Sequence, residues 1–416
     1  MTRRLLSSLA TVIVAGSVAA AQPAATKPLQ IYVVDTEGGK AALFVSPTEQ
    51  AALVDSGNPG GRDTDRIMAA IADAGVTQLD YLVSTHYHVD HIGGLQELAK
   101  RIPIATFVDH GPSVEEREQV QGFQQAYADL YGKANHMVVK PGDRIPMTGV
   151  DWRVVTSAGK VLKTPLPGGG QANPACAQFT PKEITNDPEN GQSLGTVVTL
   201  GRFRAIDLAD LLWNNEHDLM CPANPVGTVD LYLTSHHGLD QSGSPVLVHG
   251  VQPRVAVMQN GTRKGAGAQA MATMRSSPGL EDIWQLHWSY GAGIEQNSAG
   301  VFIANVDDAA TIAAVLTAPP RGGGPGRGAG APPPVAAPPH PAPAGAPAAP
   351  SAPAAAAGGA PGGGPPVAAP GGRGTPLPPH SPAYWIKITA QPDGSFVVSN
   401  SRNGFSKTYA ARPRAR

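Results

Sequence analysis

The segment Ser84-Thr85-His86-Tyr87-His88-Val89-Asp90-His91-Ile92-Gly93-Gly94 decides the fold, because it places four candidate metal ligands within six residues. In an extended backbone, side chains two residues apart point to the same side, so His86 and His88 can share one metal ion. The turn that follows can carry Asp90 and His91 to a second metal ion. Imidazole and carboxylate ligands suit zinc, and they also suit iron or manganese. The segment therefore predicts a metal centre and not a cluster of surface histidines.

Strand and helix signals alternate on both sides of this segment, which predicts an α/β fold with mixed sheets. Strands are expected at Leu29–Val34, Ala41–Val45, Ala51–Val54, Leu79–Ser84, Ile104–Val108, Thr196–Leu200, Phe203–Ile206, Val229–Thr234 and Arg254–Met258. Helices are expected at Asp63–Ala74, at Gly93–Arg101, and from a capping box at Ser113 and Glu116 to about Leu130.

Composition divides the chain into four parts. Residues 1–21 have the positive, apolar and Ala-x-Ala regions of an export signal. Residues 22–317 are long enough to bury one large core. Residues 318–382, in which 54 of 65 residues are Pro, Gly or Ala, are expected to form a disordered linker. Residues 383–416 predict a hairpin that docks on the main domain, since a lone hairpin is barely stable in water.

The predicted export signal implies a periplasmic or secreted protein with no membrane span after signal removal. In an oxidising compartment Cys176 and Cys221 are expected to form a disulfide, because the two residues flank the same predicted hairpin. The 31 Lys and Arg residues balance 32 Asp and Glu residues, for a net charge of −1. That balance argues against a long nucleic-acid track, so a small-molecule or short substrate is expected.

The spacing of His86, His88, Asp90 and His91 matches the H-x-H-x-D-H signature, and through it the chain resembles the metallo-β-lactamase-fold superfamily over most of residues 22–317. The resemblance implies an αββα sandwich with two mixed sheets. In detail the chain looks most like the β-lactamase-like domain of ComEC-type DNA-uptake proteins and their exported relatives.

Five further segments carry the resemblance to the ComEC-type domain. They are Asp35-Thr36-Glu37-Gly38-Gly39, Asp55-Ser56-Gly57, Asn190-Gly191-Gln192-Ser193, Ala209-Asp210 with Glu216, and Ser235-His236-His237-Gly238 with Ser242. Lys40 departs from the family pattern, which has an aspartate after the first of these turns.

The resemblance implies a ligand set drawn from the loops that follow the strands. The expected ligands are His86, His88, Asp90, His91, Asp210 and His236. Asp207 is an alternative to Asp210 as the bridging carboxylate. His237 is an alternative to His236, because adjacent side chains of an extended segment point to opposite sides. Asp90 is also the expected catalytic residue, orienting the nucleophile.

Further residues are candidates for orienting ligands or for contacting substrate. They are Asp35, Asp55, His110, Asn190, His237, Lys264 and His287. Asp55 is expected to orient an imidazole, since ligating histidines need an acceptor for their second nitrogen. His110 is equally consistent with a capped turn, His287 with a histidine at the edge of the core, and Lys264, beside Arg263, with a solvated basic loop.

One feature of the superfamily has no match in this chain. Many members carry a third histidine for the first metal, but only His110 and His136 lie between His91 and Asp210, and neither has a matching context. The ComEC-type group also lacks this histidine, and the Asn190 segment stands near its place. The first metal position is therefore expected to be weaker or completed by water.

The implied function is metal-assisted hydrolysis with one or two zinc ions, or with manganese or iron, on an ester-type bond. The ComEC-type resemblance favours a phosphodiester. An alternative is a metal-binding protein without catalysis, in which the linker and hairpin serve attachment or partner recognition.

Overall fold

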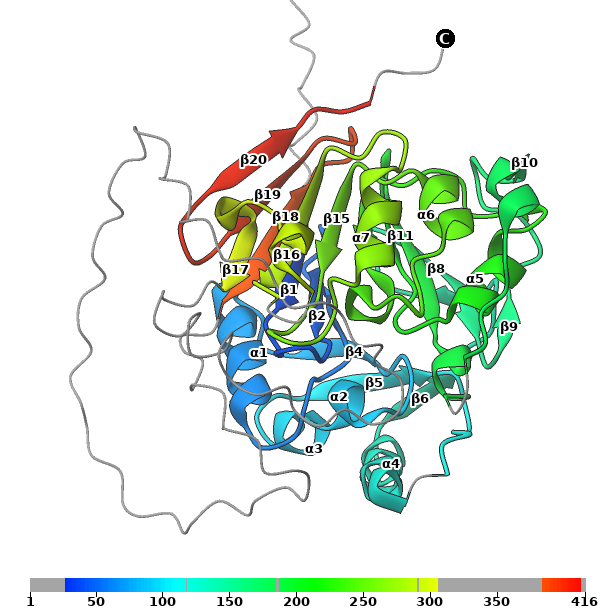
Figure 1. The fold of residues 1–416 in the computed structure, drawn as a ribbon. Helices are drawn as coiled ribbons and strands as arrows, with labels where there is room; N and C mark the ends of the chain where they lie inside the picture. The colour runs from blue at the N-terminus through cyan, green and yellow to red at the C-terminus, as the bar shows by residue number, and fades with distance from the viewer. Residues whose placement is uncertain (1–26, 117, 185–186, 290–291, 306–383, 413–416) are drawn as a thin grey trace, which may run out of the picture.

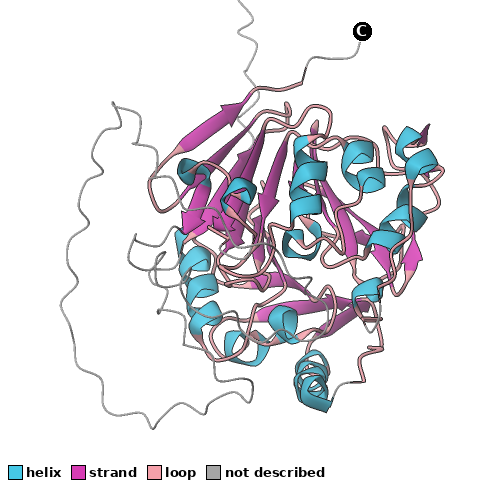
Figure 2. Cartoon of the chain, in the orientation of Figure 1, coloured by secondary structure: helices cyan, strands magenta, loops and turns pink. Residues whose placement is uncertain are grey.

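The computed structural model describes residues 27–116, 118–184, 187–289, 292–305 and 384–412. The predicted export signal and the Pro/Gly/Ala-rich linker lie outside these residues. Two nine-stranded sheets pack face to face, and helices cover their outer faces (Figures 1 and 2). The predicted αββα sandwich is therefore confirmed.

The first sheet runs in the order β20-β19-β18-β1-β2-β3-β4-β5-β6. Its strands are β1 (Leu29–Val34), β2 (Ala42–Val45), β3 (Ala51–Val54), β4 (Leu79–Val83), β5 (Ile104–Asp109), β6 (Asn135–Val138), β18 (Trp385–Ala390), β19 (Phe396–Asn400) and β20 (Ser406–Tyr409). Strands β1 to β3 are antiparallel neighbours, and β3 to β6 are parallel, so the sheet is mixed.

The second sheet runs in the order β17-β16-β15-β14-β12-β11-β8-β7, with β9 paired to β8. Its strands are β7 (Arg144–Ile145), β8 (Asp151–Ser157), β9 (Lys160–Val161), β11 (Gly195–Leu200), β12 (Phe203–Asp207), β14 (Leu231–Leu233), β15 (Val255–Met258), β16 (Asp282–His287) and β17 (Ile303–Asn305). A separate pair joins β10 (Gln171–Ala172) to β13 (Ala223–Asn224). The predicted hairpin of β11 and β12 is present.

The helices form the two outer layers. They are α1 (Arg62–Asp73), α2 (Val89–Ile92), α3 (Leu95–Leu98), α4 (Glu118–Tyr131), α5 (Trp213–Met220), α6 (Pro245–Val251) and α7 (Ala268–Arg275). Apolar side chains of α1, α3 and α4 pack on the first sheet, and those of α5, α6 and α7 pack on the second. Among the described residues, no helix is long and apolar enough to cross a membrane.

Strand β1 shows why the central strands are apolar on both faces. Leu29, Ile31 and Val33 point into the core between the sheets, whereas Tyr32 and Val34 pack in the outer layer with α1. Successive side chains of a strand point to opposite faces, and here both faces are covered, so each residue gains from burial.

The C-terminal strands extend the first sheet beyond β1. Strand β18 pairs antiparallel with β1 over six residues, from Leu29 opposite Ala390 to Val34 opposite Trp385. The expected hairpin is the first part of a three-stranded addition, because β20 pairs with β19. Figure 1 shows these strands, in red and orange, at the edge of the sandwich. They cover the edge that β1 would otherwise expose.

Two local predictions were wrong. The expected helix at Gly93–Arg101 is replaced by the short helices α2 and α3, and α2 begins within the histidine segment at Val89. Ser113 and Glu116 form no capping box. The Ser113 hydroxyl accepts the N–H of Glu115 and donates to Glu189, and helix α4 begins later, at Glu118. A distant buried carboxylate therefore outcompetes the local cap.

The predicted disulfide between Cys176 and Cys221 is confirmed, with Cα atoms 5.8 Å apart. It joins the 3-10 helix Pro174–Gln178 to the end of α5, and both cysteines pack against the outer core of the second sheet. The bridge thus closes a 45-residue stretch that contains the Asn190 segment, β11, β12 and Asp210.

Replacing Ile388 by alanine tests the docking of β18. Ile388 is fully buried between the sheets, so the change is expected to lower the free energy of unfolding by about 2–5 kcal/mol. Thr389, on the opposite face of the same strand and only partly buried, provides the control, and Thr389→Ala is expected to cost less than about 1 kcal/mol. Urea unfolding measures both, and equal losses would contradict this packing.

Candidate metal centre

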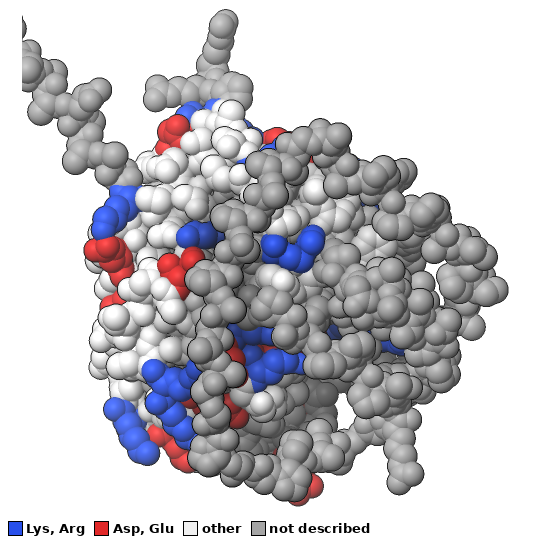
Figure 3. All heavy atoms as spheres, turned by 90° about the vertical axis from the view of Figure 1, so that its left-hand side faces the viewer, with Lys and Arg blue, Asp and Glu red and all other residues white. Residues whose placement is uncertain are grey.

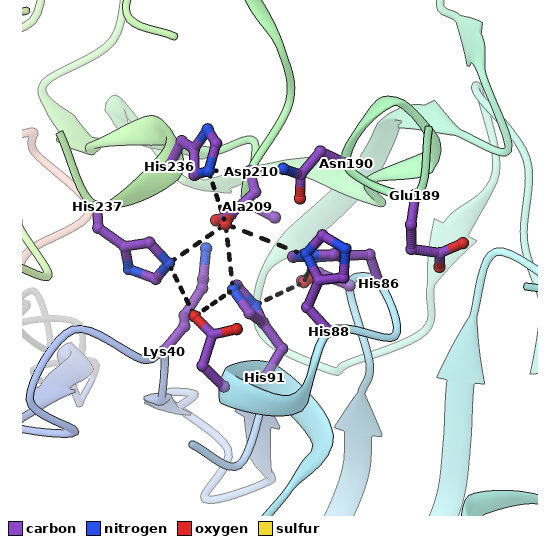
Figure 4. A network of polar contacts seen from close by, with 12 residues as sticks. Lys40, His86, His88, His91, Glu189, Asn190, Ala209, Asp210, His236 and His237 are labelled. Atoms are coloured by element: carbon purple, nitrogen blue, oxygen red, sulfur yellow. Dashed lines mark hydrogen bonds and ion pairs between the residues drawn. The ribbon is translucent and has the colours of Figure 1, made fainter. Parts of the chain in front are cut away.

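The candidate site lies where loops from both sheets meet. His86 and His88 follow β4, and α2 carries Asp90 and His91. From the second sheet, the turn after β12 carries Asp210, and the turn after β14 carries His236 and His237. Figure 4 shows the carboxylate of Asp210 at the centre of these side chains. Loops that follow strands of both sheets thus bring their polar side chains together.

The oxygen Oδ2 of Asp210 faces four imidazoles. It lies 3.2 Å from Nε2 of His237, 3.3 Å from Nε2 of His91, 3.6 Å from Nε2 of His236 and 3.9 Å from Nε2 of His86. Burial raises the pKa of this carboxyl, but the attraction of His237, His91 and His236 is stronger and holds it well below its usual range. Asp210 is therefore a buried, ionised carboxylate.

Two groups of atoms are close enough together to hold a metal ion each. One consists of His86, His91 and Asp210, and the other of Asp90, His91 and His237. The Nδ1 atom of His88 lies 3.0 Å from Nε2 of His86, which places His88 beside the first group. Four of the six expected ligands belong to these groups, and His88 adjoins them.

For His91, His237 and His86, the ring nitrogen that points away from the cluster has a polar partner outside it. Nδ1 of His91 lies 2.8 Å from Asp55 Oδ2, and Nδ1 of His237 lies 3.1 Å from the carbonyl oxygen of Gln259. An N–H directed to an acceptor at Nδ1 leaves the lone pair at Nε2. Both Nε2 atoms are buried, face the cluster and lack a hydrogen-bond partner among the described residues.

His86 is held in the same way, whereas Nε2 of His88 lies near two carboxylates without a hydrogen bond among the described residues. Nδ1 of His86 lies 3.2 Å from the hydroxyl of Thr85, which itself donates to Asp55 and can therefore accept the imidazole N–H. Nε2 of His88 lies 3.2 Å from Asp187 Oδ1 and 3.3 Å from a carboxylate oxygen of Glu115. Thr85, Asp187 and Glu115 were missed in the sequence because no spacing motif marks them.

His236 and His237 both face Asp210, contrary to the expectation that only one of them could. The segment is not extended: the backbone φ angles are +50° at His236 and +55° at His237. In this left-handed turn the side chains no longer alternate. His237 lies in the group with Asp90, whereas His236 lies near Asn190, whose Nδ2 is 3.5 Å from His236 Nε2.

Asp207 has a different environment from Asp210. Its Oδ1 accepts the N–H of Ala209 at 3.0 Å and forms a buried ion pair with Lys40. The backbone N–H of Lys40 also donates to the carbonyl oxygen of Asp90, at 3.1 Å. Lys40, at the position that departs from the family pattern, thus connects the Asp210 turn to the histidine segment.

Several candidates lie outside the two groups of ligand atoms. Asp35 pairs with His287 at 2.5 Å and with Arg66 at 2.9 Å. Burial raises the pKa of Asp35, but His287 and Arg66 outweigh it and lower the pKa to about 2. His110 contacts Glu189 at 3.0 Å. These contacts give Asp35, His110 and His287 structural partners.

Glu216, which accompanies Ala209-Asp210 in the resemblance, also lies outside the cluster. It accepts the N–H groups of Gly243 and Ser244 at 2.8 and 2.7 Å. Ser242, next to them, lies 3.3 Å from Nδ1 of His236. Glu216 therefore anchors the chain segment that holds His236 from behind.

Lys264 and Asn190 reach the edge of the cluster. The ammonium of Lys264 lies 2.6 Å from Asp90 Oδ2. Burial raises the pKa of Asp90, but Lys264, His91 and His237 outweigh it and lower the pKa well below its usual range. Asn190 donates to Asp187 at 2.6 Å and is fully buried. The amide thus stands between His236 and the carboxylate beside His88.

The donor set fits divalent transition metals. Imidazole nitrogens with free lone pairs and ionised carboxylates are the ligands that zinc, iron and manganese use in proteins. Burial lowers the pKa of His91, but the carboxylates of Asp210, Asp55 and Asp90 outweigh it and raise the pKa to about 10. A metal ion bound by His91 would therefore have to displace a proton from this ring.

Comparisons with known proteins identify similar sequences and a matching family model. Residues 35–179 match the family model of the metallo-beta-lactamase superfamily. Coenzyme F420H(2) oxidase of Methanothermobacter marburgensis is 34% identical over 112 residues, which are 26% of this chain and 26% of that protein. Competence protein ComA of Neisseria gonorrhoeae is 23% identical over 252 residues, 61% of this chain and 30% of that protein. The chain thus spans only 26% and 30% of the lengths of these curated relatives.

Among solved structures, the diiron β-hydroxylase CmlA from Streptomyces venezuelae is similar with a TM-score of 0.33 and 14% identity, over 57% of this chain and 46% of that one. The signature residues, the sandwich of two mixed sheets and the match over residues 35–179 all support the metallo-β-lactamase-fold superfamily as the one that this chain resembles.

Proposed function

We propose that this protein is a metal-dependent hydrolase whose centre is built around Asp210. The observation that carries the proposal is the orientation of the imidazoles. Histidines from both sheets direct one nitrogen into the cluster, while Asp55, Thr85 and Gln259 hold the other. A packing role for buried histidines would not require this shared orientation, whereas metal ligation does.

The residues divide between two metal positions. His86 Nε2, His88 Nδ1 and Asp210 would hold one ion, and Asp90, His91 and His237 would hold the other, with Asp210 between them. Zinc is the proposed metal, and manganese or iron suits the same ligands. Metal ions in such a site supply Lewis-acid activation of water and of the substrate at neutral pH.

The protein's own groups supply orientation and charge. Asp90 and Asp210 are held ionised, because neighbouring groups lower the pKa of both carboxyls, so each can accept a hydrogen bond from a reacting water and orient it. His236 lies at the edge of the cluster next to Asn190, where it can contact substrate. Both cysteines are in the disulfide, which leaves no thiol nucleophile to compete with this reading.

The proposed substrate is a phosphodiester that is a small molecule or a short chain. The resemblance to the ComEC-type domain favours this bond, and Lys264 at the edge of the cluster supplies a positive charge suited to an anion. Figure 3 shows basic and acidic side chains next to one another on one face, an arrangement unlike the basic track that binds long nucleic acid. We also propose a periplasmic or secreted location, supported by the disulfide.

Turnover measurements on phosphodiester, lactone and β-lactam substrates, each with zinc and with manganese, test the proposed activity. Hydrolysis of one class that depends on added metal is expected. Metal binding without turnover of any of them would instead favour the alternative of a metal-binding protein without catalysis.

Replacing His86 or Asp90 by alanine is expected to remove tight metal binding and activity without unfolding the protein. Each change deletes a ligand and leaves the surrounding strands intact. Metal content by mass spectrometry and thermal melting measure the two effects. His249→Gln is the control, because His249 lies in α6 and contacts the carbonyl oxygen of Thr273. Full metal content in the His86→Ala/Asp90→Ala double variant would refute the site.

Replacing Asp55 by asparagine is expected to weaken metal affinity roughly 10–100-fold. Asparagine tolerates the φ of +60° at this position, but it removes the charge and one of the two acceptors used by Thr85 and His91. Isothermal titration with zinc measures the effect. Asp80→Asn, at the other end of β4, is the control and should leave affinity unchanged.

The proposed substrate size predicts a weak dependence on salt. Few phosphates beyond the centre would be neutralised by side chains, so activity on a small phosphodiester should fall little between low and high salt. The salt dependence is measured as the rate of hydrolysis of this compound, and of long single-stranded DNA, across a salt series. Faster cleavage of the long strand, with a steep loss at high salt, would indicate a DNA track.

A further inference from the structure

Lys264 contacts Asp90 at the edge of the cluster. Its ammonium lies 2.6 Å from Oδ2 of Asp90. The same oxygen faces Nε2 of His237 at 3.4 Å and Nε2 of His91 at 3.7 Å. These are the three groups that form one of the two candidate metal positions. The lysine therefore holds the oxygen that a metal ion at this position would need.

The loop that carries Lys264 is closely fitted to the site. Gly265, at a φ of +88°, packs so near the carbonyl oxygen of His237 that a Cβ would lie only 2.0 Å from it. A Cβ on Gly38 would lie 3.1 Å from Cδ of Lys264, so that glycine leaves room for the lysine stem. The N–H of Gly261 donates to the carbonyl oxygen of Lys264 at 2.9 Å. The packing of this loop thus holds the backbone of Lys264 where its side chain reaches Asp90.

We propose that Lys264 competes with the metal ion for Asp90, so that the position formed by Asp90, His91 and His237 binds metal more weakly than these ligands alone would. The inference rests on the proposed metal centre. A divalent ion at Asp90 must displace the ammonium, and the tethered ammonium remains close enough to repel it.

The side chains of Lys264 and Asp90 are 34% and 20% exposed. Water therefore screens part of this repulsion and can receive the displaced ammonium, so that exchange of lysine for metal needs no unfolding. The lysine stem is flexible, and its ammonium is a compact charge without the fixed planar geometry of arginine. Lys264 thus balances the charge of Asp90 in the absence of metal and withdraws when metal enters.

Lys264→Met tests the proposal, with metal affinity and not activity as the readout. Titration of metal-free protein with zinc, in competition with a chelator of known affinity, is expected to show one of two binding steps tightened roughly tenfold and the other unchanged. Lys264→Gln repeats the test with a polar side chain. Lys264→Arg keeps the charge and should stay near the wild type. Lys133→Met, at an exposed position after α4, is the matched control.

A double-variant cycle locates the effect. In a His237→Ala background the position at Asp90 is already incomplete, so Lys264→Met should no longer tighten binding. Unchanged or weaker affinity in Lys264→Met, or equal tightening in Lys133→Met, would overturn the inference while leaving the metal centre in place. Absence of metal binding in the wild type and in every Lys264 variant would instead refute the proposed function itself.

Discussion

The buried carboxylate of Asp210 is the group on which the arrangement of the site depends. An ionised carboxylate in a protein interior is unfavourable unless charges and hydrogen-bond donors surround it. Here four imidazole Nε2 atoms from both sheets lie within 3.9 Å of one oxygen, and His91, whose pKa is raised to about 10, carries positive charge at neutral pH. The two sheets must therefore pack in one relative position, in which the loops after β4, β12 and β14 converge on Asp210.

A layer of polar contacts behind the cluster holds these loops in unfavourable backbone conformations. Asp55, Ala209, His236 and His237 all have φ between +50° and +60°, where residues other than glycine pay about 1 kcal/mol or more each. Asp55 is held by Thr85 and His91, and the Asp210 turn by the buried pair of Asp207 and Lys40. Such conformations persist where neighbouring contacts over-determine them, and here those contacts aim side chains at the centre.

Two lysines pair with carboxylates in and beside this centre. Lys40 pairs with Asp207 in the interior and links the backbone of Asp90 to the turn before Asp210. Lys264 reaches Asp90 from the edge, through a partly exposed contact. The first pair is buried and serves the arrangement of the loops. The pair of Lys264 and Asp90 is partly accessible to water, so an incoming cation can take the place of the ammonium. The two lysine–carboxylate pairs thus differ in role because they differ in burial.

Features that depend on neighbouring residues could be predicted from the sequence. The apolar strands, the hairpin of β11 and β12, and the ligand types in the segment from Ser84 to Gly94 follow from local pattern, because strand alternation and turn chemistry act over a few residues. The resemblance added Asp210, Asp55 and the two histidines of the segment after β14. The disulfide followed from its position on both sides of one hairpin.

Contacts between segments distant in sequence decided the features of the site that the sequence could not predict. The left-handed turn at His236 and His237 depends on the chain around it, so strand alternation could not predict that both rings face Asp210. The resemblance favoured Asp210 over Asp207, and the structure separates them by their partners: Lys40, 167 residues away, pairs with Asp207, whereas imidazoles surround Asp210. The pairing of Asp35 with His287 and the capture of Ser113 by Glu189 arise in the same way. The sequence alone determined which chemical groups the strand ends carry, and the tertiary structure decided which of them meet, because a buried charge selects its partners by proximity in space.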